Sequence, residues 1–171
     1  DHVGNVHKVA RARFHLQTRE MGFVTGPYMR YPKFGHSFEV EDVVGMVKLN
    51  FKGRVEQHDG EFELAPGIAL HHVGGHTPGL QIVRVMTRRG WVVLASDAAH
   101  YYEHMQKNRF FTQAFNLGDM VDGYRTCERL AASPDHIVPG HDPLVMKHYP
   151  AVSPELEGII VRLDAAPRKE G

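Results

Sequence analysis

Apolar positions along the chain follow two periods, and each period predicts a different kind of element. The valines of "SFEVEDVVGMVKLN" recur every three or four residues, which predicts a helix starting near Ser37. Alternating or short continuous apolar runs bounded by turn residues predict strands. The pattern predicts helices over residues 3–12, 37–50 and 119–131, and strands over residues 13–17, 54–58, 62–73, 80–87, 91–96, 136–140 and 158–164.

The order of these elements favours a mixed α/β (α+β) fold in which strands are flanked by helices. Residues 80–96 read as a hairpin closed by the "RRG" turn, whereas the first half of residues 20–50 reads as irregular because glycine and proline interrupt it. Nothing in the sequence reads as a linker. We therefore expect one domain over residues 1–171.

Composition narrows the class of protein. The 171 residues are 42% hydrophobic and 23% charged, ordinary values for a soluble globular protein. Twenty basic and twenty acidic residues balance, so no excess charge would attract nucleic acid or a membrane, and no apolar run is long enough to span a bilayer. The single cysteine, Cys127, excludes an internal disulfide and fits a reducing compartment, so we expect a cytoplasmic protein.

Three predicted strands are each followed by a residue that can bind a metal. His76 lies in the turn "GGHTPG", Asp97 ends "WVVLASD" and His141 follows "IVPG". Each has an ordinary alternative, because a histidine in a glycine turn is often a plain loop residue and an aspartate can cap the next helix. An unpaired carboxylate at the mouth of a buried strand is costly, however, and a threefold recurrence favours a shared site.

The first two residues add another acid and another histidine to this set. Strand ends on one edge of a sheet converge, so we expect the five side chains to approach one another. Imidazole and carboxylate without sulfur are ligands that zinc, manganese, iron or cobalt accepts. The sequence therefore predicts a metal site formed by Asp1, His2, His76, Asp97 and His141.

Taken in order, the stretches D-H, G-G-H-T-P-G, S-D and G-H-D resemble the motif series of the metallo-β-lactamase superfamily, and the text around them is most similar to its N-acyl homoserine lactonase-like branch. The resemblance covers nearly the whole chain. It implies an αββα sandwich with two divalent metal ions, zinc first among them, at one edge of the sheets. The family's first motif is H-x-H-x-D-H, so we expect the chain to begin inside it, with two histidines and the N-terminal strands missing.

The resemblance assigns a metal to each matching residue. Asp1, His2 and His141 match the ligands of the second metal. His76 matches the third histidine of the first metal, and Asp97 matches the carboxylate that bridges both. With the two upstream histidines missing, the 171-residue chain by itself is expected to bind fewer than two metals, to aggregate and to show little activity.

A two-metal site of this kind is suited to hydrolysis. Two cations can share one hydroxide, which attacks a carbonyl at neutral pH without a serine or cysteine nucleophile. Asp97 can also handle the proton. The branch usually has a tyrosine three residues after the bridging aspartate, but here His100 stands there and Tyr101 follows. Either could donate a hydrogen bond to the substrate carbonyl, and a solvent-facing helix residue is the alternative for His100.

The predicted substrate is a small-molecule lactone similar to an N-acyl homoserine lactone, with no nucleic acid or membrane partner. A thioester or ester hydrolase of the same fold, similar to glyoxalase II, is an alternative, and so is a non-catalytic fragment. The aromatic and methionine residues between Glu20 and Asn50 could line a pocket for an acyl chain, although such residues more often form core.

Overall fold

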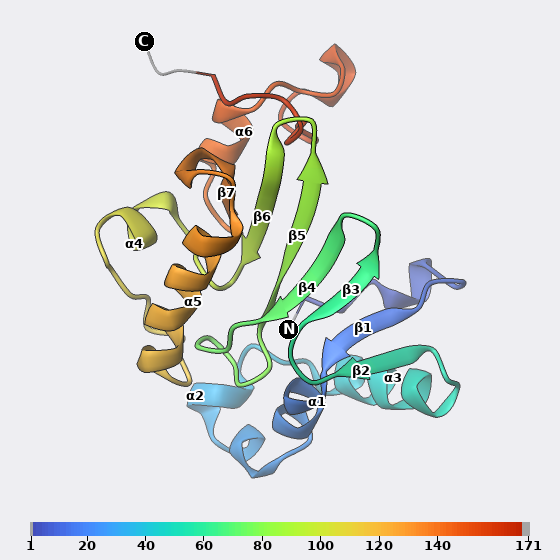
Figure 1. The fold of residues 1–171 in the computed structure, drawn as a ribbon. Helices are drawn as coiled ribbons and strands as arrows, with labels where there is room; N and C mark the ends of the chain where they lie inside the picture. The colour runs from blue at the N-terminus through green and yellow to red at the C-terminus, as the bar shows by residue number, and fades with distance from the viewer. Residues whose placement is uncertain (1, 169–171) are drawn as a thin grey trace.

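The strands form two sheets in the computed structural model, which describes residues 2–168 (Figure 1). The strands are β1 (Phe14–Gln17), β2 (Val55–His58), β3 (Phe62–Ala65), β4 (Ile68–His72), β5 (Gln81–Thr87), β6 (Gly90–Ser96) and β7 (Ile137–Pro139). The larger sheet has the order β3-β4-β5-β6-β7, antiparallel from β3 to β6 and parallel between β6 and β7. The smaller sheet is the parallel pair of β1 and β2.

Helices surround these sheets. The α-helices are α1 (Thr18–Val24), α2 (Pro32–Gly35), α3 (Val40–Phe51), α4 (Tyr102–Gln106), α5 (Leu117–Leu130) and α6 (Leu144–His148). Short 3-10 helices are η1 (Val6–Lys8), η2 (Pro27–Arg30), η3 (Pro134–His136) and η4 (Pro154–Leu156). No helix within residues 2–168 is long and apolar enough to cross a membrane.

The continuous apolar run of β6 arises because this strand is buried on both faces. Val93 and Ala95 face α5 and pack in one cluster with its Cys127, all three fully buried. Val92 points to the other face, where it packs with Tyr149. A strand covered on both sides cannot alternate apolar and polar residues, which is why "WVVLA" reads as a continuous run.

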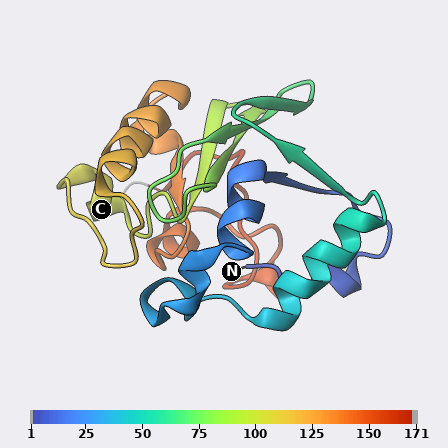
Figure 2. The ribbon, with the colours of Figure 1, turned by 90° about the horizontal axis from the view of Figure 1, so that it is seen from below.

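The two sheets face one another across a buried amide pair. Ile82 of β5 packs with α5, so its neighbour Gln81 points to the opposite face of the sheet. There Gln17 of β1 donates to Gln81 Oε1 at 3.0 Å. On the outer face of the small sheet, Gln57 donates to Asn50 Oδ1 of α3. The layers therefore run α5, large sheet, small sheet, α3, and Figure 2 shows α5 and α3 on opposite sides of the strands. This is the expected αββα arrangement.

Most of the predicted elements are confirmed. The structure contains the β5–β6 hairpin, β1, β2, α5 and a short β7, and helix α3 begins three residues after the predicted Ser37. The stretch 62–73 contains two antiparallel strands, β3 and β4, because Gly67 takes a positive φ of 80° in the turn between them.

Three predictions about local structure are wrong. Only η1 forms within residues 3–12; none of its residues is buried, so no packed stripe stabilises a longer helix. Residues 158–164 form one isolated bridge instead of a strand, and Ile159 is 68% exposed with no neighbouring strand to pair with. The first half of residues 20–50 was predicted to be irregular, but residues 18–35 contain the helices α1 and α2. Gly22 is tolerated inside α1 because the buried Phe23 anchors this helix to the core. Helices α4 and α6 were not predicted.

Candidate metal centre

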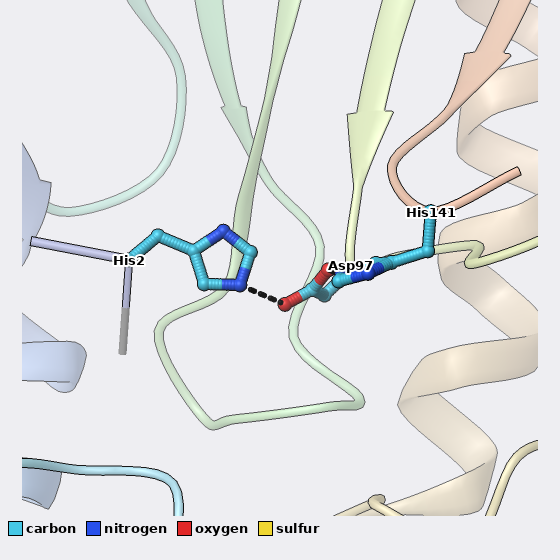
Figure 3. Close-up of side chains that lie close together, drawn as sticks. All are labelled: His2, Asp97 and His141. Atoms are coloured by element: carbon cyan, nitrogen blue, oxygen red, sulfur yellow. Dashed lines mark hydrogen bonds and ion pairs between the residues drawn. The ribbon is translucent and has the colours of Figure 1, made fainter. Parts of the chain in front are cut away.

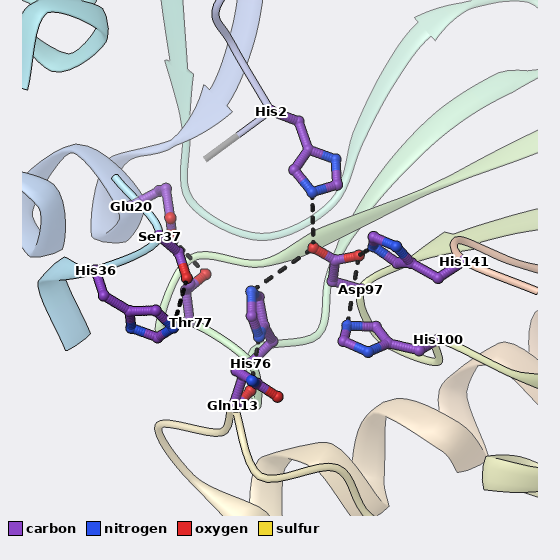
Figure 4. A network of polar contacts seen from close by, with 10 residues as sticks. All are labelled: His2, Glu20, His36, Ser37, His76, Thr77, Asp97, His100, Gln113 and His141. Carbon is purple, nitrogen blue, oxygen red and sulfur yellow. Dashed lines mark hydrogen bonds and ion pairs between the residues drawn. The ribbon is translucent and has the colours of Figure 1, made fainter. Parts of the chain in front are cut away.

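The carboxylate of Asp97, directly after β6, lies at the centre of a group of histidines (Figures 3 and 4). Asp97 is only 3% exposed. Its Oδ1 lies 2.7 Å from His141 Nε2 and 3.7 Å from His100 Nε2. Its Oδ2 lies 3.2 Å from His2 Nε2 and 3.6 Å from His76 Nε2. Four imidazoles from four separate segments thus surround one buried carboxylate.

The backbone around Asp97 explains how the ends of β6 and β7 meet. Ser96 has a φ of 46°, a left-handed conformation that non-glycine residues rarely adopt and that is often found at functional sites. Gly140 passes so close that a Cβ there would lie 2.6 Å from the Ser96 carbonyl oxygen. The backbone N–H of His141 then donates to the His100 carbonyl at 3.0 Å. Glycine at position 140 therefore lets His141 approach Asp97.

The glycine turn before His76 is packed against the start of α5. Gly74 and Gly75 have φ values of 69° and 92°, which favour glycine. A Cβ on Gly75 would lie 2.8 Å from the Cα of Met120 in α5. The turn thus has both a backbone conformation and a close contact that require glycine, and it projects His76 towards Asp97.

Two further contacts fix the turn and the ring of His76. Glu20 of α1 accepts hydrogen bonds through Oε2 from the Thr77 hydroxyl at 2.6 Å and the Gly79 N–H at 3.0 Å. His76 Nδ1 lies 2.6 Å from the Gln113 carbonyl, which can only accept, so Nδ1 carries the proton. In the neutral ring, Nε2 is then an acceptor directed at Asp97. This is the orientation that an outer-shell carbonyl gives to a metal-binding histidine.

The two residues of the "HD" pair have different roles. His141 faces Asp97, whereas Asp142 accepts hydrogen bonds from the backbone N–H groups of Tyr102 and Leu144, both at 2.9 Å. Asp142 is buried and ties the start of α4 to the loop before α6. Its side chain supports the position of His141 and is not part of the cluster around Asp97.

His100 lies inside the cluster, and Tyr101 lies at its edge. The His100 ring stacks on Phe111 with centroids 3.7 Å apart, and its buried Nε2 has no hydrogen-bond partner. Burial lowers the pKa of His100 to about 4; neighbouring imidazoles also lower the pKa, whereas Asp97 acts against the shift. The Tyr101 side chain is 42% exposed, with its ring centroid 6.4 Å from that of His100.

The structure brings together four of the five residues predicted to hold metals: His2, His76, Asp97 and His141. Asp1 lies outside the described residues. Sequence reasoning missed the supporting groups Glu20, Gly140 and Asp142. The sequence did contain a signal for Gly140, because "PGHD" follows an apolar strand. The partner of Glu20 lies 57 residues away along the chain, so no local pattern marks Glu20.

The donor set fits a divalent metal. His2, Asp97 and His141 offer ligand atoms that all lie within 4.8 Å of one another. The Nε2 of a neutral His76 also faces the carboxylate, and either a proton or a metal cation between the two atoms would hold them together. Nitrogen and carboxylate donors without sulfur suit zinc, manganese, iron or cobalt.

The aromatic residues between Glu20 and Asn50 form a packed cluster beside this centre. Phe23 contacts the rings of Tyr28, Phe34, Phe38 and Phe115 at centroid distances of 5.3–6.3 Å. A cavity of about 20 Å³, roughly the space of one water, lies between this cluster and His76. A second cavity of about 140 Å³ lies between Phe38 and the start of α3. Phe23 is buried as core, whereas Tyr28 is 44% exposed.

Comparisons with known proteins identify similar sequences and similar structures. No protein-family model matches the chain. An N-acyl homoserine lactonase of a Bacillus species is 34% identical over 77 residues, which are 44% of this chain and 29% of that protein. The AiiA protein of B. thuringiensis, solved with N-decanoyl-L-homoserine bound at its active site, has a TM-score of 0.69 at 20% identity, covering 86% of this chain and 54% of its own. AidC, a dizinc quorum-quenching lactonase, has a TM-score of 0.52 at 14% identity, covering 74% and 47%.

These likenesses show that the chain has the metallo-β-lactamase fold. The resemblance to the lactonase-like proteins of that superfamily, predicted from the motifs, is confirmed by the comparison of sequences as well as of structures. The chain spans about half the length of the solved structures and less than a third of the curated relative that it matches.

Proposed function

We propose that this chain provides the catalytic core of a metal-dependent hydrolase that opens lactones of the N-acyl homoserine lactone type. The observation that carries the proposal is the buried Asp97 carboxylate facing His2, His76 and His141, with the His76 acceptor nitrogen directed at it. The bound homoserine compounds in similar structures support a small lactone as the substrate.

The proposed site residues divide between two metals. His2 and His141 would hold one ion, with Asp1 as a third ligand; His76 would contribute to the other, and Asp97 would bridge them. When bound, the ions supply a water with a pKa lowered to about 7 and polarise the scissile carbonyl. Zinc is the proposed metal, supported by the dizinc lactonase of the same fold. Because the chain gives the first ion only His76 and a share of Asp97, we propose that the 171 residues alone bind fewer than two ions at the Asp97 cluster and show little activity.

The residues around the ions would transfer the proton and donate a hydrogen bond to the carbonyl oxygen. Water adds to the lactone carbonyl carbon, the ring C–O bond breaks, and the released alkoxide takes up a proton to leave a hydroxy acid. Asp97 would take the proton from the water and pass it on. His100, neutral at physiological pH because of its lowered pKa, has a buried Nε2 that makes no hydrogen bond and could donate one to the carbonyl oxygen. Tyr101 is the second candidate donor.

Replacement of Asp97 tests the proposal. In the chain extended upstream through an H-x-H-x sequence, Asp97→Ala should remove most lactone hydrolysis and lower the bound metal, because it deletes the bridge and the proton acceptor. His100→Ala and Tyr101→Phe should each cost less, about 10–1000-fold, as expected for one positioned donor. The measurements are proton release with an N-acyl homoserine lactone and elemental analysis.

Asp122→Ala is the matched control, since Asp122 is an exposed carboxylate on α5. It should keep both activity and metal. Wild-type turnover by Asp97→Ala protein at equal metal content would show that the assignment is wrong. Faster hydrolysis of a thioester than of any lactone would move the substrate to the glyoxalase II-like class.

A further inference from the structure

A second group of metal-binding side chains lies on the small sheet, separate from the Asp97 cluster. The parallel register pairs His15 with Glu56 and Gln17 with His58. Side chains two residues apart on a strand share a face, so His15, Glu56 and His58 all point to one side. This is the side of Gln17, which faces the large sheet. The group therefore lies between the two sheets, where β1 runs beside β2 in Figure 1.

The distances within this group match those of metal ligands. His15 Nδ1 lies 2.9 Å from His58 Nε2 and 3.8 Å from Glu56 Oε2. All three residues have a ligand atom within 4.8 Å of the others. Two nitrogens bound to one tetrahedral zinc at about 2.0–2.1 Å lie about 3.3–3.4 Å apart, so a shift of a few tenths of an ångström would admit the ion.

Surrounding residues hold the three donors in place. Arg13 donates to Glu56 Oε1 at 2.6 Å and leaves the other oxygen, Oε2, directed at His15. The His58 ring stacks on Phe62 of β3 with centroids 4.0 Å apart, and it lies parallel to the His15 ring. The His15 side chain is 17% exposed and that of Glu56 is 35% exposed, so an ion can enter from solvent. The outer contacts resemble the support that metal ligands receive in proteins.

The protonation states also suit a cation. Burial and the adjacent His15 lower the pKa of His58, which keeps its ring neutral and able to bind a metal. The hydrogen bond from Arg13 lowers the pKa of Glu56 and keeps the carboxylate charged. In the absence of an ion, the same contacts amount to a hydrogen-bonded histidine pair beside an Arg–Glu ion pair.

We propose that His15, Glu56 and His58 bind a divalent transition-metal ion of the zinc type, with three protein ligands and one open position. The two-stranded sheet gives this site a structural purpose. Its ladder has only four paired positions, and two strands without neighbours are marginally stable on their own. An ion held by both strands would clamp β1 to β2 and thereby support α1, which follows β1 directly.

The test uses a background in which the Asp97 cluster cannot bind. In the 171-residue chain carrying Asp97→Ala and His141→Ala, stripped with a chelator, titration with Zn²⁺ alone should show one ion per chain. Adding His58→Ala should weaken this binding by more than the about 10–100-fold that loss of an outer-shell partner costs. Adding Glu56→Gln, which keeps the shape, should weaken it less but in the same direction.

His7→Ala is the matched control, since His7 is an exposed histidine in η1. It should leave the affinity for zinc unchanged. Zinc should also raise the Tm of the background chain and not that of the His58→Ala chain. If the His58→Ala chain fails to fold by circular dichroism, Glu56→Gln decides. A background chain that binds no zinc, or equal affinity in the background and Glu56→Gln chains, would overturn the proposal. Neither result depends on lactone hydrolysis.

Discussion

Asp97 combines deep burial with a charge that only its neighbours can balance. The left-handed Ser96 directs it away from β6, and the missing side chain at position 140 lets β7 come close enough for His141 to reach it. A carboxylate that is 3% exposed would otherwise be costly to bury. The position of the charge thus depends on two backbone features that carry no charge themselves.

Gly140→Ala should disrupt this arrangement. The added Cβ would meet backbone atoms of Ser96 at 2.6–3.0 Å, so the strand ends must separate. We expect a loss of about 1–3 kcal/mol in the free energy of unfolding, as for other overpacking changes, together with weaker zinc binding. Urea unfolding and zinc titration measure the two effects.

Gly45→Ala in α3 is the matched control, because nothing lies within 4 Å of the added Cβ. It should be neutral or stabilising by up to about 1 kcal/mol, since alanine favours the helix. Equal stability and zinc affinity in wild-type and Gly140→Ala chains would contradict the close approach of the strand ends.

His100 should give the metal-free chain a dependence on pH. Its pKa is about 4 in the folded chain against an ordinary 6.5, so between these values only the unfolded chain takes up this proton. The free energy of unfolding should therefore fall as pH falls from 6.5 to about 4, and this contribution should level off below. Urea unfolding in a chelator at several pH values measures it. In the His100→Gln chain the free energy of unfolding should fall less steeply with pH, whereas in the His7→Gln chain it should fall as in the wild type. Identical slopes in the wild-type chain and both variants would refute the role of His100.

Whether the sequence predicts a residue of the metal centre depends on how far along the chain the partners of that residue lie. His76, Asp97 and His141 follow apolar strands at once, so local text marks them, and the structure brings them together. Glu20 acts on a turn 57 residues away, and Asp142 looks like a second ligand although its carboxylate binds backbone N–H groups. Only the folded structure distinguishes an acidic residue that faces the metal centre from one that accepts backbone hydrogen bonds.

Among the elements, α1 has an effect beyond its seven residues. It follows β1 without a break and places Glu20 against the turn that carries His76. Sequence reasoning read residues 20–35 as irregular because glycine and proline punctuate them. The helical turns form nonetheless because Phe23 is buried within an aromatic cluster, a tertiary contact that the local pattern does not record.

Glu20→Ala should loosen the His76 turn. It leaves the Thr77 hydroxyl and the Gly79 N–H without their acceptor in a partly buried place, which costs about 1–3 kcal/mol per unsatisfied group. Amide hydrogen exchange should speed up at residues 76–79, and zinc affinity should drop. Glu41→Ala, at an exposed position in α3, should change neither. Unaltered exchange at residues 76–79 in the Glu20→Ala chain would argue against the anchoring role.

At the scale of the whole molecule, the centre joins segments that are far apart in the chain. His2 precedes the first element, whereas His76, Asp97 and His141 lie on three different connections. Four elements, α4, α5, η3 and β7, lie between Asp97 and His141. An ion that binds the folded chain and not the unfolded chain stabilises the folded state by mass action. Loop closure between such distant residues is entropically costly in the unfolded chain, so metal and fold support each other.

Removal of the metal should lower the Tm. With free zinc at 100 times Kd, binding adds about 2.7 kcal/mol, which for a domain of this size corresponds to about 5–10 °C. Cys127 gives an independent readout: burial raises its pKa to about 12, so a thiol reagent should label it only when the chain opens. A chelator should speed labelling, and a Cys127→Ser chain should not label. Unchanged Tm and labelling after proven metal loss would contradict the coupling.

The spacing of the cluster along the chain also sets the order of events during synthesis. Asp97 leaves the ribosome 44 residues before His141. At a synthesis rate of about 5–20 residues per second, its carboxylate is therefore without that partner for about 2–9 seconds. Until then β6 also lacks its parallel neighbour β7. The nascent chain therefore presents an uncompensated acid beside an open apolar strand, and metal capture should be one of the last steps of its maturation.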